Sequence, residues 1–487
     1  MKKWVLSKKP WGLALVSLAT LVVGAIALES CAGEGGPILP PGGGGGGSIN
    51  AQFLALMPPG QHGASYVGPT PCKNCHNGQG GGNPVYHDWT QTKHFAKGVT
   101  CENCHGPASK HVANPTTANI LTYPNSNNPV VCAQCHGPIA NDWAQSPHAQ
   151  LAGGGFPVMD AANDPEGAGK TQRCIVCHSG LMRGLHTENG DDILSLPDSE
   201  IVNVANETLN KVPFTASCAT CHDPHKKLGN TNLAGEDVQL WHPEANTDIT
   251  AVAPGTKPPS FTQFNQVCAE CHNGWGANPT DASLNASTGR PSFHDGPQYN
   301  MLMGYSGVDN GGLGIGSTTH ASMAGQCAKC HMPNSRHTFT VSLDTSCSPC
   351  HTPTDAANRA ATIQAQTESS LLALQTRMSN WATKTFGFAD YWEYTANISE
   401  ANSPDQNLIP IEVKRARYNY HFILNDRSLG PHNAAYTNRL IQVANANLDS
   451  IGIGPVSPTR NLPPSQMKAI LFAELKRDTN AELRWKR

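Results

Sequence analysis

The sequence predicts a mainly α-helical fold with extensive irregular loops, in which apolar side chains supply only part of the core. Of its 487 residues, 38% are hydrophobic and 6% are aromatic, which is little material for a core of this size. The 47 glycines and 37 prolines favour turns and loops. The 17 cysteines and 21 histidines are therefore the residues whose excess needs an explanation.

A pattern of two cysteines, separated by two residues and followed at once by a histidine, occurs eight times. C-x-x-C-H is the attachment signal of c-type haem, because each thiol can form a thioether and the histidine ligates the iron. Zinc sites and disulfides also use paired cysteines, but neither requires a histidine after every pair. We therefore predict eight c-type haems (haem c, iron), attached at Cys72, Cys75, Cys101, Cys104, Cys132, Cys135, Cys174, Cys177, Cys218, Cys221, Cys268, Cys271, Cys327, Cys330, Cys347 and Cys350.

The histidine that ends each motif is the predicted proximal iron ligand. These residues are His76, His105, His136, His178, His222, His272, His331 and His351. Thirteen histidines remain, which is enough to give every iron a second axial histidine. A surface or hydrogen-bonding role is the alternative for each. The candidate distal ligands are His94, His111, His148, His225, His294, His320, His337 and His432.

Local sequence contexts support several of these candidates. His94 and His148 both end a W-x-x-[S/T]-x-H sequence, and His94 and His320 each precede a motif cysteine by seven residues. His225 follows His222 by only three residues, which is too close for it to reach the opposite face of the same haem. We expect His225 to serve a neighbouring haem, and such cross-ligation would hold adjacent haems together.

The N-terminus is typical of an exported lipoprotein. Residues 1–30 combine basic lysines with an apolar run and are predicted to be a signal peptide; an uncleaved membrane anchor is the alternative. The sequence before Cys31 resembles a bacterial lipobox, and Cys31 is the one cysteine outside the motifs, so it is the predicted lipidation site. Residues 31–60 are rich in glycine and proline, which predicts a flexible tether.

Two further regions follow the tether. Residues 61–353 contain all eight motifs and are predicted to be an octahaem c-type cytochrome region, in which the haems lie close together and form most of the core. Residues 354–487 are predicted to be helical. One helix is indicated by the spacing of apolar residues from Ile363 to Trp381, a second should begin near Ile411, and a third is expected over 464–486.

Several short sequences resemble a known superfamily of multihaem cytochromes, which includes nitrite reductases and hydroxylamine oxidoreductases. They are CENCHGPASKH (101–111), CHDPH (221–225), CHMP before His337 and RSLGPHNAAY (427–436). The resemblance implies a multihaem cytochrome fold and a distal-ligand role for His432. It also implies that a catalytic haem would correspond to the motif at His178, with His294 on its substrate side. The C-x-x-C-K unit of the nitrite reductases is absent.

These observations favour an electron carrier over an enzyme. Bis-histidine haems have no open iron position, and the predicted tether would attach them to a membrane surface. We expect respiratory or extracellular electron transfer. The partners would be other redox proteins, such as other multihaem cytochromes, or an extracellular acceptor. The alternative is a multihaem oxidoreductase acting on nitrite, hydroxylamine or a sulfur oxyanion. The predicted location is the outer membrane, facing the periplasm or cell surface. The net charge of −3 does not suggest a nucleic-acid partner.

Overall fold

The computed structural model describes residues 51–78, 84–149, 176–188, 193–197, 199–201, 203–204, 214–228, 236–241, 267–287, 291–311, 317–348, 350–394 and 404–456. Within these ranges the chain is helical or irregular, as the sequence predicts, and it forms no β-strand. An isolated antiparallel bridge joins His222 and Leu240. The predicted mainly α fold with irregular loops is therefore confirmed for this part of the chain.

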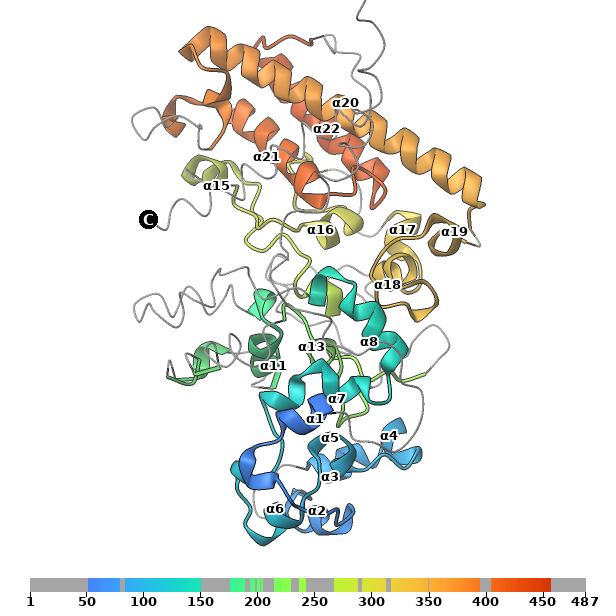
Figure 1. The fold of residues 1–487 in the computed structure, drawn as a ribbon. Helices are drawn as coiled ribbons and strands as arrows, with labels where there is room; N and C mark the ends of the chain where they lie inside the picture. The colour runs from blue at the N-terminus through green and yellow to red at the C-terminus, as the bar shows by residue number, and fades with distance from the viewer. Residues whose placement is uncertain are drawn as a thin grey trace, which may run out of the picture.

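The N-terminal part consists of short helices joined by loops and lies at one end of an elongated molecule (Figure 1). Most helices are only one or two turns long, because glycine and proline interrupt the chain so often. The elements are α1 (Ala51–Leu56), η1 (Pro59–Gln61), α2 (Thr70–Cys75), α3 (Val85–Trp89), α4 (Lys93–Ala96), α5 (Cys101–His105), α6 (Ser109–Ala113), η3 (Thr117–Asn119), η4 (Asn125–Asn127), α7 (Pro129–Ala133), α8 (Gly137–Ala144) and η5 (Pro147–Ala149).

The middle of the chain also consists of short helices joined by loops, and it occupies the centre of the molecule in Figure 1. Its elements are α11 (Gly180–Glu188), η7 (Ile193–Ser195), α13 (Cys218–Cys221), α15 (Asp281–Ala286), α16 (Gln298–Met303), α17 (Thr319–Ser322), α18 (Gln326–His331), η8 (Pro333–Ser335) and α19 (Leu343–Ser346).

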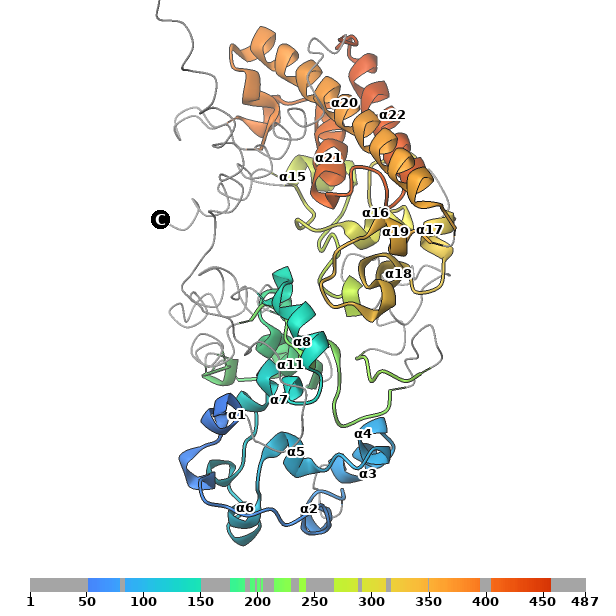
Figure 2. The same cartoon turned by 45° about the vertical axis from the view of Figure 1, so that its right-hand side comes forward.

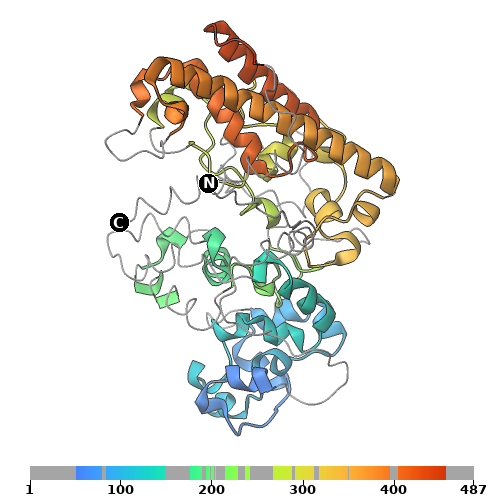
Figure 3. The same cartoon turned by 45° about the horizontal axis from the view of Figure 1, so that its top comes forward.

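The C-terminal part contains the long helices and lies at the other end of the molecule. These are α20 (Pro353–Phe386), α21 (Ile411–Asp426) and α22 (Ala434–Ser450), with η9 (Ala389–Trp392) and η11 (Gln406–Leu408) between the first two. The long helix α20 runs across α21 and α22, as Figures 2 and 3 show from two other directions. Thr352 caps α20 by accepting a hydrogen bond from the Asp355 backbone N–H, with Pro353 in the first turn.

The apolar core is unevenly distributed along the chain. One large buried cluster joins α20, α21 and α22 to the segment from Leu284 to Val308. The apolar face predicted on α20 is buried there, with Leu371, Leu374 and Met378 all 0% exposed. The region with the C-x-x-C-H motifs contains only smaller clusters, one around Phe53 and another around Trp143. Protein side chains therefore fill the C-terminal helices well and the motif region sparsely.

The predicted region boundaries compare with the structure as follows. The helix that opens the C-terminal region begins at Pro353, at the predicted junction, and the second begins at Ile411 as expected. The end of the predicted tether is already helical, because α1 starts at Ala51 and buries Phe53. The signal peptide, the first twenty residues of the tether and the helix expected over 464–486 lie outside the described residues.

Candidate haem-binding sites

Short helices carry most of the attachment motifs. In a helix, residues i and i+3 lie on the same face, so both thiols of a motif point to the same side. Side chains inside two motifs help to start their helices: Asn103 accepts a 2.7 Å hydrogen bond from the Thr100 backbone N–H, and Thr220 accepts one of 2.8 Å from the Ser217 backbone N–H. The residues between the two cysteines therefore contribute to the local fold.

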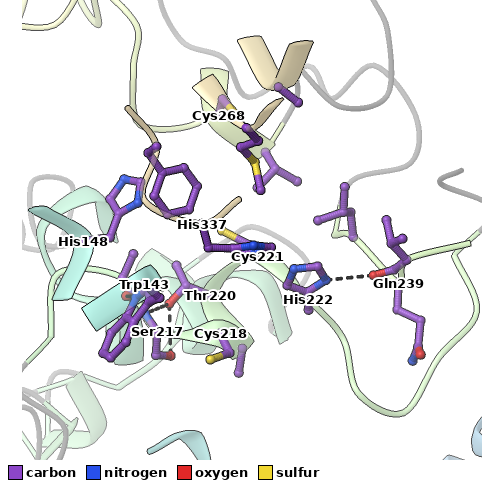
Figure 4. A pocket seen from close by; sticks show the side chains of 18 of the residues that line it. Trp143, His148, Ser217, Cys218, Thr220, Cys221, His222, Gln239, Cys268 and His337 are labelled. Carbon is purple, nitrogen blue, oxygen red and sulfur yellow. Dashed lines mark hydrogen bonds between the residues drawn. The ribbon is translucent and has the colours of Figure 1, made fainter. Parts of the chain in front are cut away.

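One large cavity of about 3580 Å³, partly open to solvent, connects the motifs. A site for one small ligand occupies about 300–1,000 Å³, so this cavity is several times larger than a single ligand requires. All eight predicted proximal histidines and all eight candidate distal histidines line it. Every described motif cysteine lines it as well; Cys31 and Cys174 lie outside the described residues. Figure 4 shows the part of the cavity around His222 and His337.

The structure places seven proximal histidines opposite seven of the distal candidates. The ring centroids of these pairs are 5.9 to 6.5 Å apart. The pairs, proximal residue first, are His76 with His111, His105 with His225, His136 with His94, His178 with His294, His222 with His337, His272 with His148, and His331 with His432.

These separations fit an iron atom between the two rings. A metal–imidazole bond is about 2 Å long and a ring nitrogen lies about 1.1 Å from its centroid, so two axial imidazoles have centroids about 6 Å apart. Direct aromatic contacts can reach similar separations, so the assignment also rests on the position of each pair beside the motif cysteines in the cavity. The residues present therefore fit a haem held by two histidines at each of the seven places.

The eighth proximal histidine has a different environment. His351 donates from Nδ1 to the Asp355 carboxylate at 2.9 Å. Within the described ranges, no histidine ring faces His351 at the separation seen in the seven pairs. The remaining distal candidate, His320, lines the same cavity and donates from Nδ1 to the Pro431 carbonyl at 2.9 Å.

Hydrogen bonds fix the tautomer of many of these histidines. Seven of the predicted ligands place Nδ1 at 2.7 to 3.1 Å from a main-chain carbonyl, and a carbonyl can only accept, so Nδ1 carries the proton. Nε2 then has a free lone pair for a metal, and the ring orientation is fixed. The seven residues are His105, His111, His222, His294, His320, His331 and His337.

Burial keeps most of the paired histidines in the neutral form that binds iron. Desolvation lowers the pKa of His105, His148 and His222 to about 4. The same cause lowers the pKa of six others, His136, His178, His225, His272, His331 and His337. His432 is the exception: burial alone would lower its pKa, but the Asp426 carboxylate raises it.

Contacts between thiols show which motifs are neighbours. Four pairs of thiols from different motifs lie close enough for one thiol to shift the pKa of the other: Cys72 with Cys101, Cys132 with Cys218, Cys177 with Cys271, and Cys268 with Cys327. Electrostatic interactions add three more pairs: Cys104 with Cys132, Cys221 with Cys268, and Cys330 with Cys347.

These contacts arrange the motifs in a line with one branch. The line begins at the motif of Cys72 and continues through those of Cys101, Cys132, Cys218, Cys268 and Cys327 to that of Cys347. The motif of Cys177 does not lie between its sequence neighbours. Its thiol instead contacts Cys271, which makes it a side branch.

Two groups of residues near the motifs were not identified from the sequence. Asp426 and Asp355 bond the ring nitrogens of His432 and His351. Arg183 forms a buried 2.7 Å ion pair with Glu270, which lies between Cys268 and Cys271. The i,i+4 spacing of His351 and Asp355 at a helix start was a usable signal for one of these contacts. The ion pair joins residues far apart in the sequence and had no local signal.

Residues 131–194 match a protein-family model described as cytochrome c554 and c-prime. No curated protein matches the chain. Among solved structures, the chain resembles an undecahaem cytochrome from the S-layer of Carboxydothermus ferrireducens, with 20% sequence identity and a TM-score of 0.43 over 72% of this chain and 50% of that one. It also resembles the outer cell wall cytochrome OcwA, with 17% identity and a TM-score of 0.43 over 72% of this chain and 70% of that one.

The repeated motif and the family match support c-type haem as the cofactor of a multihaem cytochrome, a class that fits electron transfer. The chain spans half the length of the S-layer cytochrome. In the part of the chain that the structure describes, no helix is both long and apolar enough to cross a lipid bilayer.

Proposed function

We propose that this protein is an exported octahaem c-type cytochrome that transfers electrons between redox partners. The observation that carries the proposal is the set of seven facing histidine pairs, all of which line one connected cavity together with the motif cysteines. A c-type haem, when bound, would supply one-electron chemistry at its iron. The motif cysteines would attach the cofactor, the facing histidines would hold its iron, and hydrogen bonds to main-chain carbonyls fix the tautomers of seven of these histidines.

The pairing favours the carrier over the enzyme. His178 ends the motif at which family resemblance would locate a catalytic haem, and His294 faces it at 5.9 Å. Two axial histidines leave no iron position for a substrate. His294 is therefore better assigned as a distal ligand than as a substrate-side base, and no catalytic residue is proposed.

His320 is proposed as the distal partner of His351. His94 lies seven residues before one motif and faces His136, the proximal histidine of the following motif. His320 lies seven residues before the motif of Cys327, and the following motif is that of His351. The same relation therefore assigns His320 to His351, and the Pro431 carbonyl already orients the His320 ring with Nε2 free.

The two ends of the motif line are the proposed sites of electron exchange. Cys75 and Cys350, in the first and last motifs of the line, are both exposed. A third exposed motif cysteine, Cys135, lies along the line. Partners that approach these places would be redox proteins, among them other multihaem cytochromes, or an extracellular acceptor. The resemblance to nitrite reductases and hydroxylamine oxidoreductases is proposed to reflect shared haem packing.

Export and membrane attachment are proposed from the N-terminal sequence. Residues 1–30 would direct secretion, Cys31 would carry the lipid, and the glycine-rich segment that follows would separate the cytochrome from an outer-membrane surface. Fractionation of cells that produce the wild type or C31A tests this assignment. The wild type is expected with outer membranes and C31A in the soluble exported fraction; equal membrane association of both would contradict lipidation.

The spin state of the purified ferric protein tests the carrier proposal. Mass spectrometry should count eight covalently bound haems, and electron paramagnetic resonance should detect low-spin iron only. The reduced protein should then bind no carbon monoxide. A stoichiometric high-spin haem that binds carbon monoxide would overturn the assignment as a pure carrier, and turnover with nitrite, hydroxylamine or tetrathionate would then be measured.

A further inference from the structure

Two carboxylates bond ring nitrogens of predicted axial histidines, and both belong to the last two motifs of the line. Asp426 Oδ1 lies 2.6 Å from Nδ1 of His432, the histidine that faces His331. Asp355 Oδ2 lies 2.9 Å from Nδ1 of His351. The Ser346 hydroxyl donates to the Cys330 carbonyl at 2.6 Å, so these two motifs are also neighbours in space.

Asp426 is held in place from several sides. It is the last residue of α21 and is 1% exposed. The Ser428 hydroxyl donates to Oδ2, and the Ser428 backbone N–H donates to the same oxygen at 3.3 Å. Oδ1 is left for His432. The carboxylate is thus aimed at the imidazole by residues of the same turn, and it is shielded from water.

Asp355 is oriented by the start of α20. Its backbone N–H bonds the Thr352 hydroxyl, and Arg359 Nε donates to both carboxylate oxygens at 2.9 and 2.8 Å. The arginine lies one turn further along the same helix. Asp355 is half-exposed, with 41% of its side chain accessible, so its effect on His351 should be weaker than that of Asp426 on His432.

Carboxylates near two other predicted ligands make different contacts. Asp223 lies 3.9 Å from Nδ1 of His225 and instead accepts from the His225 backbone N–H at 2.8 Å. Asp142 accepts from the His337 backbone N–H at 3.3 Å, while Nδ1 of His337 donates to the Ser335 carbonyl. Asp223 and Asp142 therefore lie near predicted ligand histidines, but neither forms a hydrogen bond with the imidazole ring.

A carboxylate partner makes an imidazole a stronger donor than a carbonyl partner does. A stronger and more negative axial ligand stabilises ferric iron relative to ferrous iron, which lowers the reduction potential. We propose that Asp426 and Asp355 make the haems attached at Cys327/Cys330 and Cys347/Cys350 the low-potential end of the line. This inference rests on the proposed electron-carrier function and adds a direction to it: electrons enter at the C-terminal end and leave toward Cys72.

Redox titration of the holoprotein, followed by visible absorption, tests the proposal. In D426N the most negative midpoint potentials should rise by about 59 mV, a tenfold change in the ferric-to-ferrous ratio for a one-electron couple. D355N should give a smaller rise. D142N is the matched control, because it neutralises a carboxylate near His337 that does not bond the ring; any shift in its potentials should be smaller than in D426N.

The result that would overturn the proposal is a holoprotein of either variant with eight low-spin haems and unchanged potentials. That outcome would leave the electron-carrier function intact, whereas a substrate-binding haem in the wild type would defeat the function itself. D355N changes a half-exposed side chain, so it provides the test even if D426N fails to fold. A shift of equal size in D142N would also contradict the proposal, because it would show a general charge effect.

Discussion

His225 and His105 face each other with ring centroids 5.9 Å apart and ring planes 9° apart. His225 lies three residues after the proximal histidine of a different motif, so one short segment serves two sites. His105 is also fixed by its Nδ1 hydrogen bond to the Leu121 carbonyl. The contact therefore ties two motifs together that are distant in sequence.

Replacing His225 tests this contact. H225A should convert one of the eight low-spin haems to a high-spin form, because His105 would lose its facing ligand. Electron paramagnetic resonance and carbon monoxide binding should detect about one open haem per molecule. H87A is the control, since the His87 side chain is 73% exposed and faces no other histidine ring in the described ranges. Unchanged low-spin spectra in H225A would remove His225 from the ligand set.

Gly430 determines how the chain reaches His432. Its φ is +116°, which favours glycine, and an added Cβ would lie 2.4 Å from the Ile363 side chain. G430A should therefore destabilise the protein by about 1–3 kcal/mol and disturb the His432 haem spectrum. G387A is the control, with φ of +82° but nothing within 4 Å of the added atom. Equal effects in both variants would show backbone strain without a packing clash.

The buried ion pair between Arg183 and Glu270 should be costly to break from one side. Their side chains are 7% and 4% exposed. R183M leaves a buried carboxylate unpaired and should lower the free energy of unfolding by about 3–5 kcal/mol. The double variant R183M/E270Q should recover much of this loss, as measured by chemical denaturation. If the losses measured for R183M and E270Q alone add up to the loss in the double variant, the ion pair is not the source of the loss.

The pair of Asp142 and Arg336 should make stability depend on acid pH. Hydrogen bonding to Arg336 lowers the pKa of Asp142 from its usual 3.8. A lowered folded-state pKa contributes stability above pH 3.8, and this is lost as the pH falls through the lowered value. D142N should thus be slightly less stable than the wild type at neutral pH, and the difference should vanish in acid. Thermal unfolding between pH 2 and 7 measures it; a difference that grows in acid would contradict the assignment.

The helical fold was predictable because its signals are local. The apolar spacing from Ile363 to Trp381 defines the buried face of α20, and Thr352 with Pro353 marks its start. The attachment motifs are equally local, since both thiols and the histidine lie within five residues. The sequence also pointed to His225 as the ligand of a neighbouring motif, from the short distance to His222 alone.

The partners of these residues were not predictable, because they depend on how distant segments pack. Nothing near His105 indicates that His225 faces it, and nothing near Cys177 indicates its contact with Cys271. The same holds for Arg183 and Glu270. Asp426 precedes His432 by six residues, but the turn that brings them together depends on Gly430 and its contact with α20.

The cross-tied histidine pairs have a consequence for how the protein is made. Five proximal histidines each face a histidine that lies later in the chain: His76, His105, His178, His222 and His331. During synthesis and secretion, each of these motifs emerges before its partner does. If the facing histidines ligate haem as proposed, each of these sites can be completed only after its later segment has been secreted, and the site of His331 only after His432.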